Sequence, residues 1–168
     1  MQFTVTETIA ADRSEVLRAL ADPGYYAHLG EATTAVRAPE LLSVSEDGGT
    51  IRTSVRYAFD GTITGPAAMV VDPAKLTWVI ETTYDTGTHT GTVVVVPDHY
   101  EGMLRCSGTL VLEECPDGTT VETVSGRLEV RVPLVSGAAE QAIFGGFTRH
   151  VELEATAMGA YCATLRQE

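Results

Sequence analysis

Residues 136–167 read SGAAEQAIFGGFTRHVELEATAMGAYCATLRQ and come directly after a series of predicted strands and hairpins. At a helical repeat, apolar side chains collect on one side of this segment and polar side chains on the other. The apolar stripe comprises Ile143, Phe147, Val151, Met158, Tyr161 and Leu165. The polar side comprises Arg149, Glu152, Thr156, Arg166 and Gln167. Such a helix measures roughly 45 Å, whereas strands of about ten residues reach roughly 33 Å. We therefore predict one long C-terminal helix that crosses the concave face of a sheet.

Three polar residues interrupt or border this apolar stripe and are the first candidates for a functional site. Glu140 and Glu154 lie near its centre, and His150 lies at its edge. A buried carboxylate without a partner is energetically costly and therefore uncommon. The alternative to a functional role is that Glu154 pairs with an arginine, or that it lies near a helix end or loop and reaches water.

The length of the chain bounds the number of domains, and its charge bounds the chemistry of its binding partner. With 168 residues the chain can bury a core, and we expect one domain over residues 1–168. The formal net charge is −12, and Lys75 is the single lysine. This balance argues against nucleic acid or an anionic membrane as the partner. A neutral or cationic small molecule, or another protein, fits better. No stretch approaches ~20 uninterrupted apolar residues, so we expect no membrane insertion.

The start of the chain and its cysteines bear on the compartment. Met1 is followed at once by an alternating strand rather than by a basic segment and an apolar run, so we expect no signal peptide. The three cysteines, Cys106, Cys115 and Cys162, are odd in number and lack Cys-x-x-Cys spacing. We expect a cytoplasmic protein with reduced thiols. No local histidine and cysteine pattern predicts a zinc site, and we expect neither a metal nor a cofactor.

The beginning of the chain reads as one strand followed by two short helices. Apolar residues alternate with polar ones from Phe3 to Ile9, where Glu7 falls on the apolar side. Asp12-Arg13-Ser14-Glu15 has the form of a capping box at a helix start. Pro23 is favoured at the first position of the second helix.

From Ala35 to the long helix, the chain reads as strands joined by turns. The turns at residues 47–49, 72–75, 85–87 and 116–118 are built from Asp, Gly and Pro. Successive hairpins predict an antiparallel meander with one face wet. Its apolar face comprises Ile51, Val55, Tyr57 and Phe59, then Met69 and Val71, then Leu76, Trp78, Ile80 and Tyr84.

A three-residue loop at 116–118 sets the register of the last hairpin. Counting back from it places Arg105 opposite Glu129 on the outer face and Gly108 opposite Gly126 on the inner face. Glycine inside a strand usually marks a bend or a close approach. Either the long helix packs tightly there, or the sheet curls and leaves space for a ligand.

A pair of glycines also interrupts the long helix. Gly145 and Gly146 cost roughly 2 kcal/mol relative to two alanines. Our hypothesis is that the helix kinks or frays here, so that its first turns act as a flap. Hydrogen exchange as slow at residues 138–147 as in the rest of the helix would contradict it.

Residues 130–140 read VRVPLVSGAAE and run from a strand through Pro-Leu-Val into the long helix. This passage and the order of elements resemble the START-like (SRPBCC) superfamily, which includes polyketide cyclases and pollen-allergen-like proteins. Within it, the chain resembles an uncharacterised bacterial family, a domain of unknown function. The resemblance implies a single START-like α+β domain with the helix-grip fold. In that fold, two short helices follow the first strand, and a long C-terminal helix crosses the concave face of a curved antiparallel sheet.

The resemblance also implies a cavity between sheet and helix that takes a hydrophobic small molecule or lipid. The inward-facing positions predict its lining. From the sheet these are Tyr57, Phe59, Met69, Trp78, Tyr84, Cys106 and Gly108; from the helix they are Phe147, Glu154, Met158 and Tyr161. Aromatic rings, adaptable methionines and a few polar tips suit an apolar pocket that orients one polar group.

Three functions remain open on this pattern. The leading hypothesis is a carrier or sensor that binds its ligand without chemistry, because the chain has no Gly-x-Ser-x-Gly elbow, no phosphate-binding glycine loop and no paired metal-ligand histidines. The second is a cyclase, dehydratase or hydrolase in the same cavity. Glu154 or Glu7 would then act with His150 or Tyr161 as acid and base.

The third hypothesis is a protein-interaction module with a filled cavity. Its contact residues would be His99 and Tyr100 in the break between two strands, together with Tyr25 and Tyr26. The sequence does not identify a protein partner.

Overall fold

The computed structural model describes residues 1–32, 39–59, 69, 71–132 and 136–167. These residues form a seven-stranded antiparallel sheet in the order β1-β7-β6-β5-β4-β3-β2, with helices on one of its faces. The strands are β1 (Gln2–Ile9), β2 (Glu40–Asp47), β3 (Thr50–Ala58), β4 (Thr77–Asp85), β5 (Thr90–Pro97), β6 (Leu104–Glu114) and β7 (Thr120–Val130). The helices are α1 (Arg13–Leu20), α2 (Pro23–Ala32), the short 3-10 helix η2 (Pro73–Lys75) and α3 (Ser136–Leu165).

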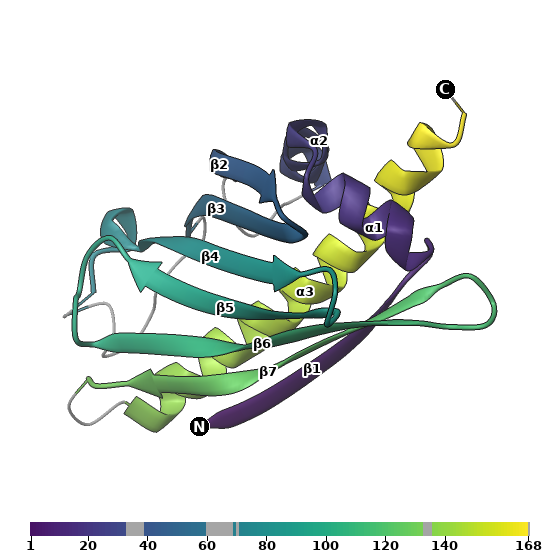
Figure 1. Cartoon of the computed structure of the whole chain (residues 1–168). Helices are drawn as coiled ribbons and strands as arrows, with labels where there is room; N and C mark the ends of the chain where they lie inside the picture. The colour runs from purple at the N-terminus through teal and green to yellow at the C-terminus, as the bar shows by residue number, and fades with distance from the viewer. Residues whose placement is uncertain (33–38, 60–68, 70, 133–135, 168) are drawn as a thin grey trace.

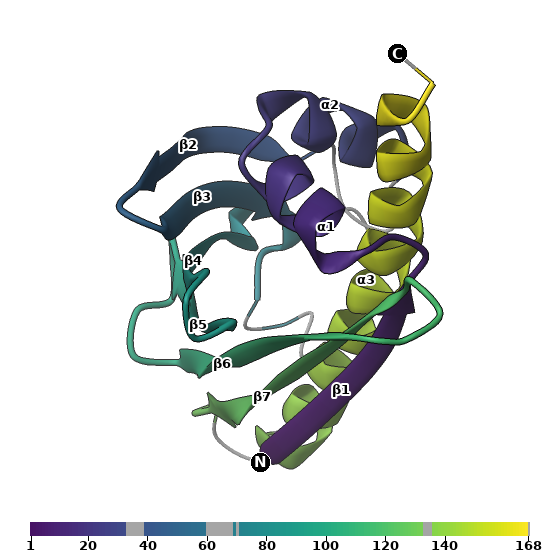
Figure 2. The ribbon, with the colours of Figure 1, turned by 45° about the vertical axis from the view of Figure 1, so that its right-hand side comes forward.

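The sheet is curved, and α3 runs along its concave side (Figures 1 and 2). Helix α3 contacts β1 and β7 at one edge of the sheet, and it also contacts α1 and α2. These two short helices lie at the end of the sheet where α2 also contacts β2. The elements therefore enclose a space between the sheet and α3, and the predicted α+β helix-grip architecture is confirmed.

The register of β6 against β7 is the predicted one. Arg105 pairs with Glu129, and Gly108 pairs with Gly126. A Cβ atom added to Gly108 would lie 2.4 Å from the Ser125 carbonyl oxygen, and one at Gly126 would lie 2.3 Å from that of Ser107. The glycines are therefore needed because the two strands themselves approach closely where the sheet bends. Close packing of α3 does not require them.

The N-terminal helices form as the sequence predicts. The Asp12 carboxylate accepts a hydrogen bond from the Glu15 N–H at 2.9 Å, and Glu15 accepts one from the Asp12 N–H at 3.2 Å. This completes the capping box at the start of α1. The expected exposure of Tyr25 and Tyr26 is wrong. They are only 3% and 5% exposed, because α2 turns both rings toward the interior of the fold.

The predicted strand residues Met69 and Val71 lie in no strand. Met69 is 87% exposed and does not face the interior. Asp72 accepts a hydrogen bond from the Ala74 N–H at 3.0 Å and caps η2, which leads into β4. The apolar types of Met69 and Val71 suggested a strand, but the local Asp-Pro turn chemistry organises the described part of this segment instead. Residues 60–68 and 70 lie outside the described residues.

Helix α3 begins and ends close to its predicted limits and continues without a break through Gly145 and Gly146. Glu140 in its first turns does not face the cavity. Its carboxylate accepts a hydrogen bond from the Val130 N–H at 3.0 Å and lies 3.2 Å from the Met1 amino group. Glu140 therefore ties α3 to β7 and β1. The flap hypothesis for the glycine pair remains a prediction.

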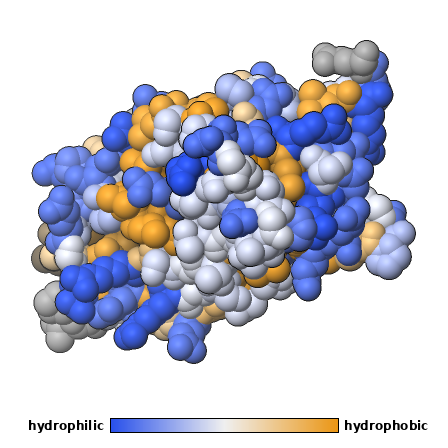
Figure 3. Space-filling view, viewed as in Figure 1, coloured by the Kyte–Doolittle hydropathy of each residue, from blue (hydrophilic) through white to orange (hydrophobic). Residues whose placement is uncertain are grey.

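The face of the sheet opposite α3 is mixed in polarity. Figure 3 shows a central area of near-neutral hydropathy, bordered by hydrophilic and by hydrophobic areas. Exposed apolar side chains of the described strands include Leu42 on β2 and Val94 and Val96 on β5. None of the helices in the described ranges is long and apolar enough to cross a membrane.

Candidate functional site

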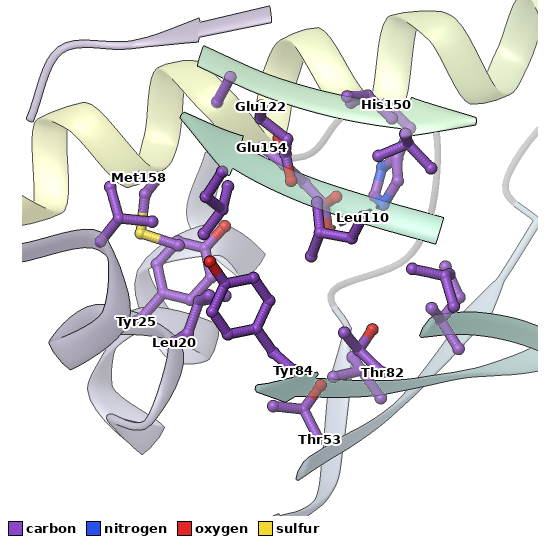
Figure 4. Close-up of a pocket in the computed structure, with 18 of the residues that line it drawn as sticks. Leu20, Tyr25, Thr53, Thr82, Tyr84, Leu110, Glu122, His150, Glu154 and Met158 are labelled. Carbon is purple, nitrogen blue, oxygen red and sulfur yellow. Dashed lines mark ion pairs between the residues drawn. The ribbon is translucent and has the colours of Figure 1, made fainter. Parts of the chain in front are cut away.

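A cavity of about 110 Å³ lies between the concave face of the sheet and α3. Side chains from β3, β4, β6 and β7 form one wall, α3 forms the opposite wall, and α1 and α2 contribute at one end (Figure 4). Most of the lining is apolar, including Val16, Leu20, Ile51, Val55, Leu110 and Val124. Alternation along the strands and the apolar stripe of α3 direct these side chains to the same interior.

Three polar side chains meet at one side of the cavity, where α3 approaches β3. Glu154 Oε1 accepts a hydrogen bond from the Tyr57 hydroxyl at 2.8 Å and lies 3.1 Å from His150 Nε2. His150 precedes Glu154 by one helical turn, which places both on the same side of α3. At a distance of 3.1 Å the imidazole and the carboxylate attract each other electrostatically. The imidazole ring packs edge-on against the Tyr57 ring at a centroid distance of 4.8 Å.

The charges within this trio stabilise one another. Burial by itself would raise the pKa of Glu154, but His150 and the Tyr57 hydroxyl outweigh it and hold that pKa below its usual value. Burial would likewise lower the pKa of His150, yet the Glu154 charge raises it overall. Burial first, and Glu154 second, raise the pKa of Tyr57, so its hydroxyl remains a donor. The trio is thus a carboxylate held by a histidine whose charged form it favours and by a phenol.

A second carboxyl group, Glu122 of β7, also lines the cavity. It pairs across the strands with Glu7 of β1, so two acidic residues lie directly opposite each other. Burial, followed by the charges of Glu154 and Glu7, raises the pKa of Glu122 to about 8. Glu122 is therefore protonated at neutral pH, whereas Glu154 is ionised. The cavity holds two carboxyl groups in different protonation states.

Tyrosine hydroxyls supply further polar atoms at the cavity. Tyr84 of β4 is 1% exposed, and its hydroxyl has no hydrogen-bond partner among the described residues. Figure 4 shows the Tyr84 ring reaching from its strand into the group of lining side chains. The Tyr26 hydroxyl donates to the Leu20 carbonyl oxygen at 2.8 Å, so it serves packing. Tyr84 therefore retains hydrogen-bonding capacity that the described protein groups do not use.

Several predicted lining residues do face the cavity. They are Tyr57, Tyr84, Phe147, Glu154 and Met158, together with the candidate acid-base residue His150. Glu154 lies in the middle of α3 rather than near a helix end, and its partners are His150 and Tyr57 rather than an arginine, although its side chain remains 29% exposed.

Other predicted lining residues lie outside the cavity. They are Phe59, Met69, Trp78, Cys106, Gly108 and Tyr161, and Glu7 among the catalytic candidates. Trp78 is the cross-strand neighbour of Tyr57 on the same face of the sheet, where the two rings stack at 6.2 Å and 16°. The Tyr161 hydroxyl donates to Asp22 at 2.8 Å and joins α3 to the start of α2. Burial raises the pKa of the Cys106 thiol to about 11, so it stays protonated and unreactive.

Sequence reasoning missed Glu122, although the signal was present. Gly126 was placed on the inner face of its strand, and residues four apart in a strand share a face. Glu122 therefore had to point inward as well. The buried residues of α2 could not be found in the same way, because its ten residues show no clear apolar stripe. Among the described residues, no group of three or more potential metal ligands comes together.

Solved structures with a similar architecture agree with the helix-grip fold of this chain. The "Zhui aromatase/cyclase" from Streptomyces sp. R1128 is 17% identical, with a TM-score of 0.66 over 97% of this chain and 93% of that chain. The protein TTHA0849 from Thermus thermophilus gives the same identity and TM-score over 98% and 99%. A norcoclaurine synthase point mutant from Thalictrum flavum is 15% identical, with a TM-score of 0.63 over 99% and 96%. These similarities show that the chain has the helix-grip fold.

The family is defined by the sequence itself. Residues 4–162 match the family described as "Protein of unknown function (DUF2505)", and the chain belongs to it. A search of curated protein sequences finds no match.

Proposed function

We propose that the protein binds a compact hydrophobic molecule in the cavity under α3 and acts as a carrier or sensor. The observation that supports this most directly is an apolar cavity with a polar trio, Tyr57, His150 and Glu154, on one wall. Such a lining holds the apolar part of a ligand by burial and orients one polar group.

The cavity volume restricts the ligand. Pockets for drug-sized molecules usually measure ~300–1,000 Å³, whereas this cavity measures about 110 Å³. An engineered apolar cavity of roughly 150 Å³ is known to take up benzene. The present cavity is smaller, so benzene is an upper limit for a ligand that fits as the protein stands. A lipid or polyketide would require α3 to move away from the sheet.

Cavity filling provides the test. Ala155 is buried on α3 and lines the cavity, so Ala155→Leu fills it. Ala160→Leu on the exposed side of the same helix is the matched control. Native mass spectrometry after incubation with benzene and isobutanol should show retention by the wild type and by the control, and loss in Ala155→Leu. Thr82→Ile fills the cavity from β4 and repeats the test if Ala155→Leu unfolds. Equal retention by the filled variants, or no retention by the wild type, would contradict the proposal.

One observation favours a second candidate, an enzyme of the cyclase, dehydratase or hydrolase type in the same cavity. Glu122 is protonated and Glu154 ionised, and such a pair can supply an acid and a base. Two structures with this fold are an aromatase/cyclase and a synthase. Under this candidate, Glu154→Gln should abolish turnover and leave ligand binding intact. Unchanged turnover would remove Glu154 from the chemistry.

The protein-interaction alternative has lost part of its support. Tyr25 and Tyr26 are buried. The Tyr100 hydroxyl accepts a hydrogen bond from the Asp72 N–H at 2.8 Å and thereby holds the loop before η2. His99 remains exposed, and a single exposed histidine is weak support for a binding surface.

A further inference from the structure

Acidic groups exceed basic groups at the polar end of the cavity. Glu122 and Glu154 both line it, and Glu7 lies opposite Glu122 on the neighbouring strand. Among the described lining residues, His150 is the one basic side chain, and it is already paired with Glu154. Neither Glu7 nor Glu122 has an ion-pair partner within the described part of the chain.

Directly opposed like charges on adjacent strands destabilise a sheet. The free protein avoids this cost by keeping Glu122 protonated. A cation beside Glu122 would remove the same cost in another way, because it would stabilise the ionised carboxylate. The cavity is therefore better suited to a positive than to a negative group.

An independent feature points to a ligand elsewhere in the same cavity. The Tyr84 side chain is 1% exposed and lines the cavity, yet its hydroxyl has no partner among the described residues. A buried polar atom without a hydrogen bond costs about 1–3 kcal/mol. Such atoms are uncommon in folded proteins and need an explanation. A bound polar molecule that contacts the Tyr84 hydroxyl would supply the missing partner.

We propose that the ligand of this cavity is a small hydrophobic amine, bound in its protonated form beside Glu122 and Glu154. The inference rests on the proposed binding function and specifies its ligand class. The ammonium group donates hydrogen bonds to the Glu122 carboxylate and to the Glu154 oxygen that Tyr57 does not occupy. The hydrocarbon part lies against apolar lining residues such as Val124 and Leu110.

The charges also exclude related ligands. A carboxylate ligand would meet the Glu154 charge in a cavity of low polarity, where like-charge repulsion is strong. An alcohol of the same shape can accept or donate hydrogen bonds, but it gains no charge attraction. The order of affinity is therefore amine, then alcohol, then carboxylate.

Amine binding is coupled to the proton on Glu122. The protonated amine binds the ionised carboxylate, so binding releases this proton and tightens as the pH rises toward 8. The groups that act on Glu122 are Glu7 on β1, Tyr25 on α2 and Glu154 on α3. His150 on α3 lines the same cavity and is paired with Glu154. On β6, its cross-strand neighbour is the apolar Leu112. Simple amines remain protonated over this range, because their pKa lies near that of lysine at about 10.4.

Three isosteric probes test the inference on the full chain by NMR titration at pH 7.5. These are isobutylamine, isobutanol and isobutyrate. We expect isobutylamine to bind at least tenfold tighter than isobutanol, and isobutyrate to bind weakest. Glu122→Gln should reduce the preference for the amine to less than threefold. Glu113→Gln, an exposed residue of β6, is the matched control and should keep the preference.

A second measurement needs no variant. Between pH 6.5 and 8.5, the affinity of the wild type for isobutylamine should rise roughly 20-fold, as a pKa of about 8 at Glu122 requires. The affinity for isobutanol should stay constant. Equal affinity for amine and alcohol, or a preference that survives Glu122→Gln, would overturn the amine inference. Isobutanol binding that Ala155→Leu blocks would then still support the proposed function. If none of the three probes binds, both proposals fail.

Discussion

Replacing Glu122 with glutamine should change how the stability of the protein depends on pH. Burial, Glu154 and Glu7 raise the pKa of Glu122 from 4.5 to about 8 on folding. Between these values the unfolded chain has lost the proton and the folded protein has kept it. The unfolded state then binds fewer protons, so the free energy of unfolding falls as the pH rises. The contribution of Glu122 is fully present below pH 4.5 and is lost progressively up to about pH 8.

The size of the effect follows from the same two pKa values. One pKa unit corresponds to about 1.4 kcal/mol. The Glu122 contribution to the free energy of unfolding should therefore fall by roughly 2.5 kcal/mol between pH 5 and pH 7. The side chain of glutamine does not ionise, so the Glu122→Gln variant lacks this loss. His150 and Glu154 add their own pH dependence to both proteins, and the difference between them isolates Glu122.

Urea denaturation of the wild type and Glu122→Gln at pH 5, 6, 7 and 8 measures this difference. The variant should gain stability relative to the wild type by roughly 2.5 kcal/mol from pH 5 to pH 7. Glu113→Gln removes an exposed carboxylate from β6, and its free energy of unfolding should change with pH as that of the wild type does. A difference that stays within about 0.5 kcal/mol over this range would show that Glu122 is ionised in the folded protein, and it would refute the reasoning.

Chemical denaturation of four further variants tests one site residue, one glycine of the sheet, one glycine of α3 and one helix cap. Tyr57→Phe removes the hydrogen bond to Glu154 and should destabilise the protein by about 1.5–3 kcal/mol at pH 7; an unchanged midpoint would mean that water replaces the phenol. Gly126→Ala should cost more than about 2 kcal/mol, because the added Cβ would lie 2.3 Å from a backbone oxygen. Gly146 lies within α3, and a Cβ atom added there would meet no neighbouring atom, so Gly146→Ala should instead stabilise the protein by about 1 kcal/mol. If both glycine variants changed stability in the same direction, this reasoning would be contradicted. Asp12→Ala removes the cap of α1 and should cost about 1 kcal/mol, whereas a cost near zero would mean that the cap is dispensable.

Local chemistry explains which parts of the fold were predictable. The capping box at Asp12 and the register between Arg105 and Glu129 depend on residues close together in the chain or across one hairpin, and both were predicted. The strand assigned to Met69 and Val71 failed, because two apolar residues at alternate positions do not distinguish a strand from an exposed segment that leads into a turn.

The candidate site was predictable only in part, for a similar reason. Alternation and helical periodicity directed Tyr57, Tyr84 and Glu154 inward, and the structure places all three at the cavity. The same patterns also directed Trp78 and Cys106 inward, but they do not tell whether an inward residue faces a cavity or packs against its neighbours. In the structure Trp78 packs on Tyr57, and neither Trp78 nor Cys106 lines the cavity.

The sequence by itself determined the antiparallel meander, the two short helices and the long amphipathic helix, because periodicity and turn chemistry act over a few residues. Tertiary structure decided the functional geometry. It brought Tyr57 within 2.8 Å of Glu154, and it set Glu7 opposite Glu122. The protonation states in the cavity then follow from burial and from charges that lie far apart in the chain. No local pattern encodes those distances, because they depend on how far the sheet curves under α3.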